Sequence, residues 1–252
     1  MVLASLNGEA HILEQLESLR DQTYLPDELI VSDDGSSDRT LDLVEDFAKT
    51  VTFPVRVLRG PQRGYAANFA QAAMHSVGDL VFFCDQDDVW IEGKVESVVE
   101  SFLQLPDSVR LVVHDLKPIS ESGRIMDGTV MAAFRTHGIS EDQFVKGCAT
   151  AVDRRFLSTL RWRPERLAHD TWLHLLAESV GGRLVTHSVL GKYRIHDGQA
   201  SGVWLEVPNS QRLNAKKTAS LSCLTKLGQG LQSMDFRIRR GITAASLRPR
   251  SF

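Results

Sequence analysis

The chain has 252 residues, of which 42% are apolar and 24% are charged, and its formal net charge is -3. These proportions are those of an ordinary folded domain, and they exclude a disordered acidic chain, a collagen-like chain and a bundle of membrane spans. Residues 1–204 contain 20 Lys and Arg against 30 Asp and Glu, a net of -10, whereas residues 205–252 contain 9 against 2, a net of +7. We therefore expect an acidic folded body followed by a basic tail, and no nucleic-acid partner.

The cysteines Cys84, Cys148 and Cys223 are odd in number and widely spaced, which fits neither a disulfide framework nor a metal-ligand pattern. The N-terminus shows no signal-peptide pattern, and no apolar stretch reaches the length of about 18–20 residues that spans a bilayer. We expect free thiols in a reducing compartment and a cytoplasmic location.

Short apolar runs alternate with helical patterns through the first half of the chain. Strands are predicted at 1–5, 28–32, 54–58 and 79–84, and helices at 12–19, 41–48, 66–74 and 95–102. The run 79–84 has almost no polar alternation, as in a strand that is covered on both faces. The alternation predicts an α/β fold, with a mostly parallel sheet flanked by helices through about residue 105.

The second half of the body is less regular. Here the pattern predicts a strand at 110–114, a turn and strand within 144–152, an amphipathic helix at 169–180 and a strand or hairpin at 183–195. Strand signals disappear from residue 205 onward. We therefore predict a folded body over 1–204, with halves at 1–105 and 106–204, and a helical or irregular C-terminal extension over 205–252.

An acidic cluster follows the predicted strand at 79–84, at the end where ligands bind in parallel sheets. Asp85, Asp87 and Asp88 lie within four residues, and their carboxylates repel one another unless a cation neutralises them. Carboxylate oxygens suit Mg²⁺ or Mn²⁺. An EF-hand is excluded because Trp90 stands where its loop requires glycine. A solvated acidic loop is the alternative interpretation.

A second acidic pair, Asp33 and Asp34, follows the predicted strand at 28–32. Helix capping accounts for residues 36–38, but not for two adjacent carboxylates before Gly35. A carboxylate at this edge can accept hydrogen bonds from a nucleobase or a ribose.

The predicted helix at 169–180 begins with His169 and Asp170. Asp170 lies in the first turn, where the helix dipole stabilises a carboxylate, so stabilisation of the helix and general-base catalysis are both open. His169 fits a capping or core position. His196 fits a structural histidine or, beside the acidic loop, a further metal ligand.

Together these motifs resemble the family 2 glycosyltransferases, which have the GT-A fold, over about residues 1–204. Residues 3–9 (LASLNGE) and 30–38 (IVSDDGSSD) are similar to two nucleotide-binding segments, and 84–90 (CDQDDVW) to the DxD metal motif in its bacterial rhamnosyltransferase-like form. Residues 144–149 (FVKGCA) resemble the acceptor-side turn. Residues 169–173 (HDTWL) resemble the motif of the catalytic base, and 193–196 (YRIH) a late segment whose histidine approaches the metal or diphosphate.

The resemblance implies a metal-dependent inverting enzyme that moves a sugar from a nucleoside-diphosphate sugar to a hydroxyl of a glycan or lipid-linked glycan, in bacterial surface polysaccharide synthesis. It implies Mg²⁺ or Mn²⁺ as cofactor, a nucleotide-binding half at 1–105 and an acceptor and catalytic-base half at 106–204. The implied site residues are Asp170 as base; Asp87, Asp85 and His196 as metal ligands; Ser5, Asn7, Glu9, Asp34, Arg63, Asp85 and Asp88 as nucleotide-sugar contacts; and Gly147, Cys148 and Trp172 as acceptor contacts.

Three other functions share some of these sequence features. In a haloacid-dehalogenase-like phosphatase Asp85 is the nucleophile and Asp87 the acid/base, but that fold places the motif on its first strand. A catalytically inactive sugar-binding protein of the same fold is a second alternative, against which the intact Asp85, Asp87 and Asp170 argue. A dinucleotide dehydrogenase is disfavoured because no G-x-G-x-x-G follows the first strand.

The basic tail carries a pattern of its own. The residues Leu221, Leu224, Leu227 and Leu231, followed by Arg237, Arg239 and Arg240, indicate a basic amphipathic helix at an anionic membrane surface. Such a helix would hold the domain at the inner face of the cell membrane, beside a lipid-linked acceptor. Gly228 and Gly230 weaken the helix, and a solvated tail is the alternative.

Overall fold

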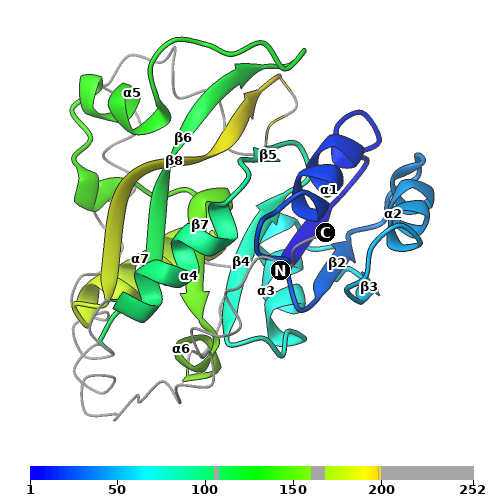
Figure 1. The fold of residues 1–252 in the computed structure, drawn as a ribbon, viewed down its shortest axis with the longest axis horizontal. Helices are drawn as coiled ribbons and strands as arrows, with labels where there is room; N and C mark the ends of the chain where they lie inside the picture. The colour runs from blue at the N-terminus through cyan, green and yellow to red at the C-terminus, as the bar shows by residue number, and fades with distance from the viewer. Residues whose placement is uncertain (105–107, 160–167, 198, 200–252) are drawn as a thin grey trace.

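The computed structural model describes residues 1–104, 108–159, 168–197 and 199. Within them, one sheet has the strand order β3-β2-β1-β4-β7-β6-β8-β5 (Figure 1). The strands are β1 (Val2–Ser5), β2 (Leu29–Asp33), β3 (Val55–Arg59), β4 (Leu80–Asp85), β5 (Val89–Trp90), β6 (Leu111–Ser120), β7 (Thr150–Asp153) and β8 (Arg183–Ile195). The α-helices are α1 (Ile12–Arg20), α2 (Thr40–Ala48), α3 (Tyr65–Met74), α4 (Lys94–Gln104), α5 (Val130–Thr136), α6 (Arg154–Thr159) and α7 (His169–Ser179); short 3₁₀ turns are η1 (Glu141–Gln143) and η2 (Gly147–Ala149).

The first half of the chain forms the parallel part of the sheet, as the alternating pattern predicts. β1 pairs in parallel with β2 and β4, and β2 pairs in parallel with β3. The register places Ser5 beside Asp33, and Ala4 beside Asp85. The carboxyl ends of these strands therefore bring both acidic clusters to one edge of the sheet.

The second half of the sheet is mixed. β7 runs antiparallel to β4 and to β6, while β8 pairs in parallel with β6 and antiparallel with β5. The region predicted as a strand or hairpin is one strand, β8, of 13 residues. β6 extends beyond the predicted 110–114 because its polar end, from Lys117 onward, pairs with the last four residues of β8.

Two apolar clusters cover the two faces of the sheet, and alternate strand residues contribute to each. Val81 and Phe83 belong to the cluster that also contains residues of α3 and α7. Phe82 and Cys84 belong to the opposite cluster, with residues of α1, α2 and α4. β4 is thus buried on both faces, as its unbroken apolar run predicts.

The predicted extension, including Cys223 and the membrane-binding helix pattern of the tail, lies outside the described residues. Of the helices that the structure describes, none is both long enough and apolar enough to cross a membrane. Cys84 and Cys148 are free and buried.

Candidate functional site

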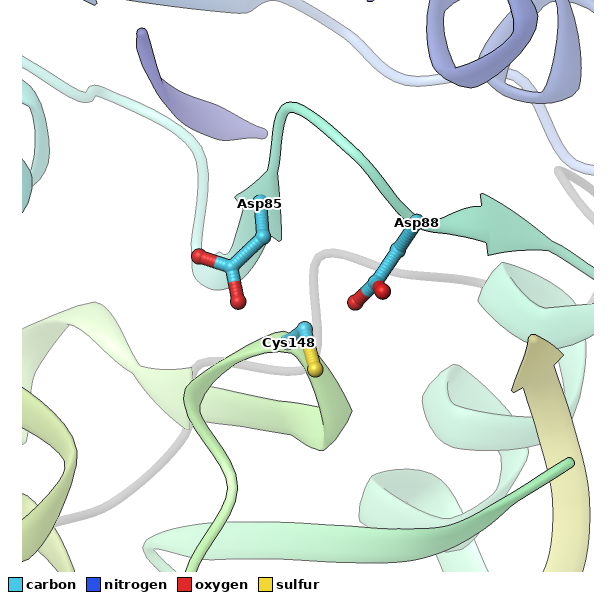
Figure 2. Close-up of side chains that lie close together, drawn as sticks. All are labelled: Asp85, Asp88 and Cys148. Carbon is cyan, nitrogen blue, oxygen red and sulfur yellow. The ribbon is translucent and has the colours of Figure 1, made fainter. Parts of the chain in front are cut away.

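The acidic turn after β4 brings two carboxylates close to a thiol. Ligand atoms of Asp85, Asp88 and Cys148 all lie within 4.8 Å of one another, and Figure 2 shows the two carboxylates reaching from the two ends of the turn toward Cys148. Burial is the largest cause, and the charge of Asp87 the second, of the rise in the pKa of Asp88 to about 7. Burial and the charge of Asp88 likewise hold the pKa of Asp85 well above its usual value. The turn therefore carries the charge repulsion that the sequence predicts.

Cys148 is an unsuitable ligand for a hard cation. The side chain is only 2% exposed, and burial, followed by the charges of Asp88 and Asp85, raises the pKa of the thiol well above its usual value. The sulfur thus stays protonated at neutral pH, whereas Mg²⁺ and Mn²⁺ bind oxygen ligands.

Asp87 faces His196, the residue that follows β8. Its Oδ2 lies 2.9 Å from Nε2 of His196, and the two side chains are 20% and 16% exposed. The structure thus brings together two of the predicted metal ligands from distant parts of the chain. On the other side of the turn, the carboxylate of Asp88 is buried and interacts with the thiol of Cys148. This donor set of carboxylate and imidazole fits a divalent cation.

The two predicted nucleotide-binding segments interlock at the same edge of the sheet. The Ser5 hydroxyl is buried and donates to Oδ2 of Asp33 at 2.7 Å. Asn7 and Glu9 each accept a backbone N–H of the 36–39 segment at 2.9 Å. Asn7 and Glu9 are exposed, so they can reach a ligand, whereas Ser5 supports the strand end beneath them.

Asp34 orders the loop that carries Arg63. Its carboxylate accepts the backbone N–H of Gln62 at 2.5 Å and that of Gly64 at 3.0 Å. Gly64 has φ of +85°, a conformation that glycine adopts without strain. Asp34 thereby holds the exposed Arg63 near the two predicted nucleotide-binding segments.

Asp170 lies in the first turn of α7, where the sequence places it. Its Oδ1 accepts the backbone N–H of Thr171 at 2.6 Å. Burial raises the pKa of Asp170, but His169, His174 and the Thr171 N–H outweigh burial and lower the pKa below its usual value. The carboxyl is therefore ionised at neutral pH, which is the state that accepts a proton.

Gly147 connects the acidic turn to Asp170. A Cβ on Gly147 would lie 2.8 Å from Nε2 of His169 and 3.6 Å from Cβ of Asp170, while the next residue, Cys148, lies against Asp85 and Asp88. The η2 turn therefore lies against both the acidic turn and the start of α7. Two predicted acceptor residues, Gly147 and Cys148, lie between the predicted metal turn and the predicted base.

Trp172, the third predicted acceptor residue, packs against the cluster on the α3 and α7 face. Its indole N–H is buried and has no hydrogen-bond partner among the described residues. Its contact with an acceptor stays a prediction.

Two buried lysines at the site were missed from the sequence. Lys94 is 1% exposed, donates from Nζ to the carbonyl of Cys148 at 2.8 Å and lies 3.7 Å from the centre of the Trp90 ring. Lys146 is also buried and donates to the Tyr193 hydroxyl at 3.0 Å. The sequence contains one sign that Lys94 is buried. This residue directly precedes the apolar residues that repeat at helical spacing in α4.

A buried histidine beside the site is expected to make the fold sensitive to acid. Nδ1 of His174 accepts the Nε–H of Arg183 at 2.9 Å, and Nε2 lies 2.8 Å from Oγ1 of Thr150. Burial, then the charge of Arg183, lowers the pKa of His174 from 6.5 to about 3. The unfolded chain therefore binds more protons than the folded chain between these pH values. We expect stability to fall as pH falls through this window, by at most about 1.4 kcal/mol per pH unit from this group.

Urea unfolding at about pH 7.5 and about pH 5.5 measures this contribution. His174→Gln is expected to be less stable than the parent at the higher pH and to lose less stability on acidification. His187→Gln is the control, because the His187 side chain is 61% exposed. Identical pH dependence in the parent and His174→Gln would contradict the assignment.

Comparisons with known proteins identify the family of the chain. The model of "Glycosyl transferase family 2" matches residues 1–146. The dTDP-rhamnosyl transferase RfbG of Shigella flexneri is 30% identical over 39% of this chain, which is 36% of RfbG. The Escherichia coli UDP-Glc:alpha-D-GlcNAc-diphosphoundecaprenol beta-1,3-glucosyltransferase WfgD is 25% identical over 80% of this chain and 78% of its own length.

A solved structure shows the same fold. The mannosyltransferase PcManGT of Pyrobaculum calidifontis, in complex with GDP-Man and Mn²⁺, superposes with a TM-score of 0.61 at 19% identity over 78% of this chain and 56% of its own. The chain thus spans less than two thirds of RfbG and of PcManGT. Because the family model covers more than half of its residues, the chain belongs to glycosyl transferase family 2.

Proposed function

We propose that the chain is a metal-dependent inverting glycosyltransferase. It transfers a sugar from a nucleoside-diphosphate sugar to a hydroxyl of a glycan or lipid-linked glycan, in the synthesis of a bacterial surface polysaccharide. One observation carries the proposal: the η2 turn contacts the acidic turn through Cys148 and the Asp170 segment through Gly147. This arrangement supports a site in which a bound cation and a catalytic base act on one substrate.

The relatives support the class of donor. The names of RfbG and WfgD specify dTDP-rhamnosyl transfer and UDP-Glc as donor, and PcManGT was solved with GDP-Man. All three name a sugar activated by a nucleoside diphosphate. The name of WfgD also specifies a diphosphoundecaprenol-linked acceptor, which supports the lipid-linked class. Family membership disfavours the phosphatase alternative.

Asp87, His196 and Asp85 would hold Mg²⁺ or Mn²⁺ in this proposal. The facing pair of Asp87 and His196 and the mutual repulsion of Asp85 and Asp88 support a cation here. A bound cation supplies Lewis acidity that stabilises the negative charge of the leaving diphosphate.

Asp170 is the base of the proposed reaction. It takes the proton of the acceptor hydroxyl as the hydroxyl oxygen forms a bond to the anomeric carbon of the donor sugar. The bond from that carbon to the diphosphate breaks, and the nucleoside diphosphate leaves from the opposite face with the electron pair. One displacement of this kind inverts the anomeric configuration.

The remaining predicted residues retain their roles as proposals. The exposed Asn7, Glu9 and Arg63, with Asp34, surround the base and ribose of the donor. Ser5 acts through Asp33, and Asp88 lies beside the diphosphate. Gly147, Cys148 and Trp172 border the acceptor.

Donor binding and product configuration test the proposed function together. Uridine, deoxythymidine and guanosine diphosphate sugars are screened by thermal shift, with Mn²⁺ or with chelator. One donor is expected to raise the melting temperature only with Mn²⁺, because a ligand that binds the native state stabilises it. NMR of the transferred or hydrolysed sugar is expected to show inverted configuration. Absence of binding and turnover across the panel contradicts the function, and a retained configuration contradicts the inverting mechanism.

Gly147→Ala is expected to slow transfer by about 10- to 100-fold, because a displacement of about 1 Å near the reacting groups has effects of this size. The added methyl would lie 2.8 Å from Nε2 of His169 and must push the turn or the ring aside. The overpacking is expected to cost about 1–3 kcal/mol of stability. Turnover and urea unfolding measure the two effects.

Gly78→Ala is the matched control, since its Cβ would meet nothing nearer than 3.6 Å. Adding His169→Ala to Gly147→Ala removes the ring that the methyl meets, so the double variant is expected to be more active than Gly147→Ala alone. Parent-like activity of Gly147→Ala would show that the site tolerates a displaced turn.

A further inference from the structure

A buried arginine at the end of β8 contacts the backbone of the acidic turn. Arg194 is 1% exposed. Its Nε donates to the carbonyl of Asp87 at 2.8 Å, its Nη1 to the carbonyl of Glu121 at 2.8 Å and its Nη2 to Oε2 of Glu14 at 2.5 Å. Its backbone N–H donates to Oδ1 of Asp88 at 3.0 Å. One residue thus contacts both Asp87 and Asp88.

Cation binding depends on which atoms of Asp87 the guanidinium of Arg194 contacts. A guanidinium that paired with the carboxylate of Asp87 would compete with a cation for its oxygens. Arg194 instead binds the carbonyl of Asp87, and the carboxylate faces His196 at 2.9 Å. The backbone of the turn is thereby fixed without a guanidinium on the carboxylate of Asp87, which is left to face the imidazole of His196.

Glu14 of α1 supplies the countercharge. Its side chain is 53% exposed, whereas that of Arg194 is 2% exposed. A buried charge is costly unless it is paired and hydrogen-bonded, so Glu14 contributes to holding the guanidinium in this geometry. The pair also ties the acidic turn to the helix that follows the predicted nucleotide-binding segment 3–9.

We propose that Arg194, held by Glu14, is a positioning residue that sets the acidic turn so that Asp87 and His196 face one cation. This inference rests on the proposed function for the existence of that cation. Neither residue contacts the cation or a substrate. Their removal should weaken cation binding while the ligands themselves remain, as when groups that orient metal ligands are lost.

Mn²⁺ binding to the full chain, measured by calorimetry, is the primary test. Glu14→Ala is expected to weaken Mn²⁺ affinity about tenfold, and Arg194→Lys about 10- to 100-fold, because an ammonium cannot replace the directed donors of a guanidinium. Glu14→Gln keeps an acceptor without the charge and is expected to lie between the parent and Glu14→Ala. Glu17→Ala, also exposed on α1, is the control and is expected to bind like the parent.

Steady-state kinetics distinguish a positioning role from a general loss of activity in the variants. For Glu14→Ala, transfer is expected to need more Mn²⁺, with kcat at saturating Mn²⁺ close to that of the parent. Parent-like Mn²⁺ affinity in folded Glu14→Ala and Arg194→Lys, checked by circular dichroism, overturns the positioning role and leaves the proposed function intact. A low kcat that saturating Mn²⁺ does not restore also overturns it. A parent chain that binds neither Mn²⁺ nor Mg²⁺ overturns both.

Discussion

Replacing Asp170 with Asn is expected to lower kcat for sugar transfer by about 10²–10⁴-fold, the usual contribution of a general base. The amide has the shape of the carboxylate but cannot take the proton of an acceptor hydroxyl. The fold should be preserved, since an amide oxygen can also accept the Thr171 N–H that Asp170 accepts at 2.6 Å. Turnover with a saturating donor measures the effect, and thermal shift with the nucleoside diphosphate is expected to be unchanged.

Glu178→Gln provides the matched control for Asp170→Asn. Glu178 is on the same helix, and its side chain is 57% exposed. Its carboxylate pairs with Arg183 at 3.7 Å and not with a predicted site residue, so turnover is expected to stay at the parent level. If Asp170→Asn transfers sugar as fast as the parent, another group takes the proton.

The parallel half of the fold could be predicted because each of its strands and helices has a sequence pattern within its own residues. Each strand from β1 to β4 is a short apolar run, and α1 to α3 lie between them with apolar residues at helical spacing. The Asp33 and Asp85 clusters could be placed at one edge for the same reason: each ends a parallel strand.

The second half of the sheet depends on pairing between strands that are far apart in the sequence, and a local sequence pattern does not reveal such pairing. The polar end of β6 contains Pro118, which disfavours a central strand. It is a strand because residues 117–120 pair with residues 192–195 of β8. The short β5 and α5 lack a periodic run long enough to be recognised, and both were missed.

The proposed metal ligands of the candidate site could be named from the sequence, whereas the groups that hold them in place could not. Asp87 and His196 were paired from motif resemblance, and their side chains are 2.9 Å apart. Lys94, Lys146 and Arg194 are buried at the site, although charged residues are rarely buried without partners. Only the folded structure reveals the carbonyl, hydroxyl and carboxylate groups that they meet.

Replacing Asp87 with Asn is expected to lower kcat/KM by about 10³-fold, or about 4 kcal/mol, the order of the charge stabilisation that a bound cation supplies. The amide removes the negative charge and leaves a weaker oxygen ligand. It can still hydrogen-bond to His196, so the melting temperature is expected to change little. Calorimetric titration with Mn²⁺ should detect loss of binding in the same variant.

Comparison with Asp88→Asn identifies which carboxylate binds the cation. Oδ1 of Asp88 accepts the backbone N–H of Arg194, a contact that an amide oxygen can replace, so this variant is expected to keep most of its Mn²⁺ affinity. Asp127→Asn, at an exposed position, is the control. If Asp88→Asn loses Mn²⁺ and Asp87→Asn retains it, the cation lies between Asp85 and Asp88. In that case the 2.9 Å contact of Asp87 with His196 is a structural hydrogen bond.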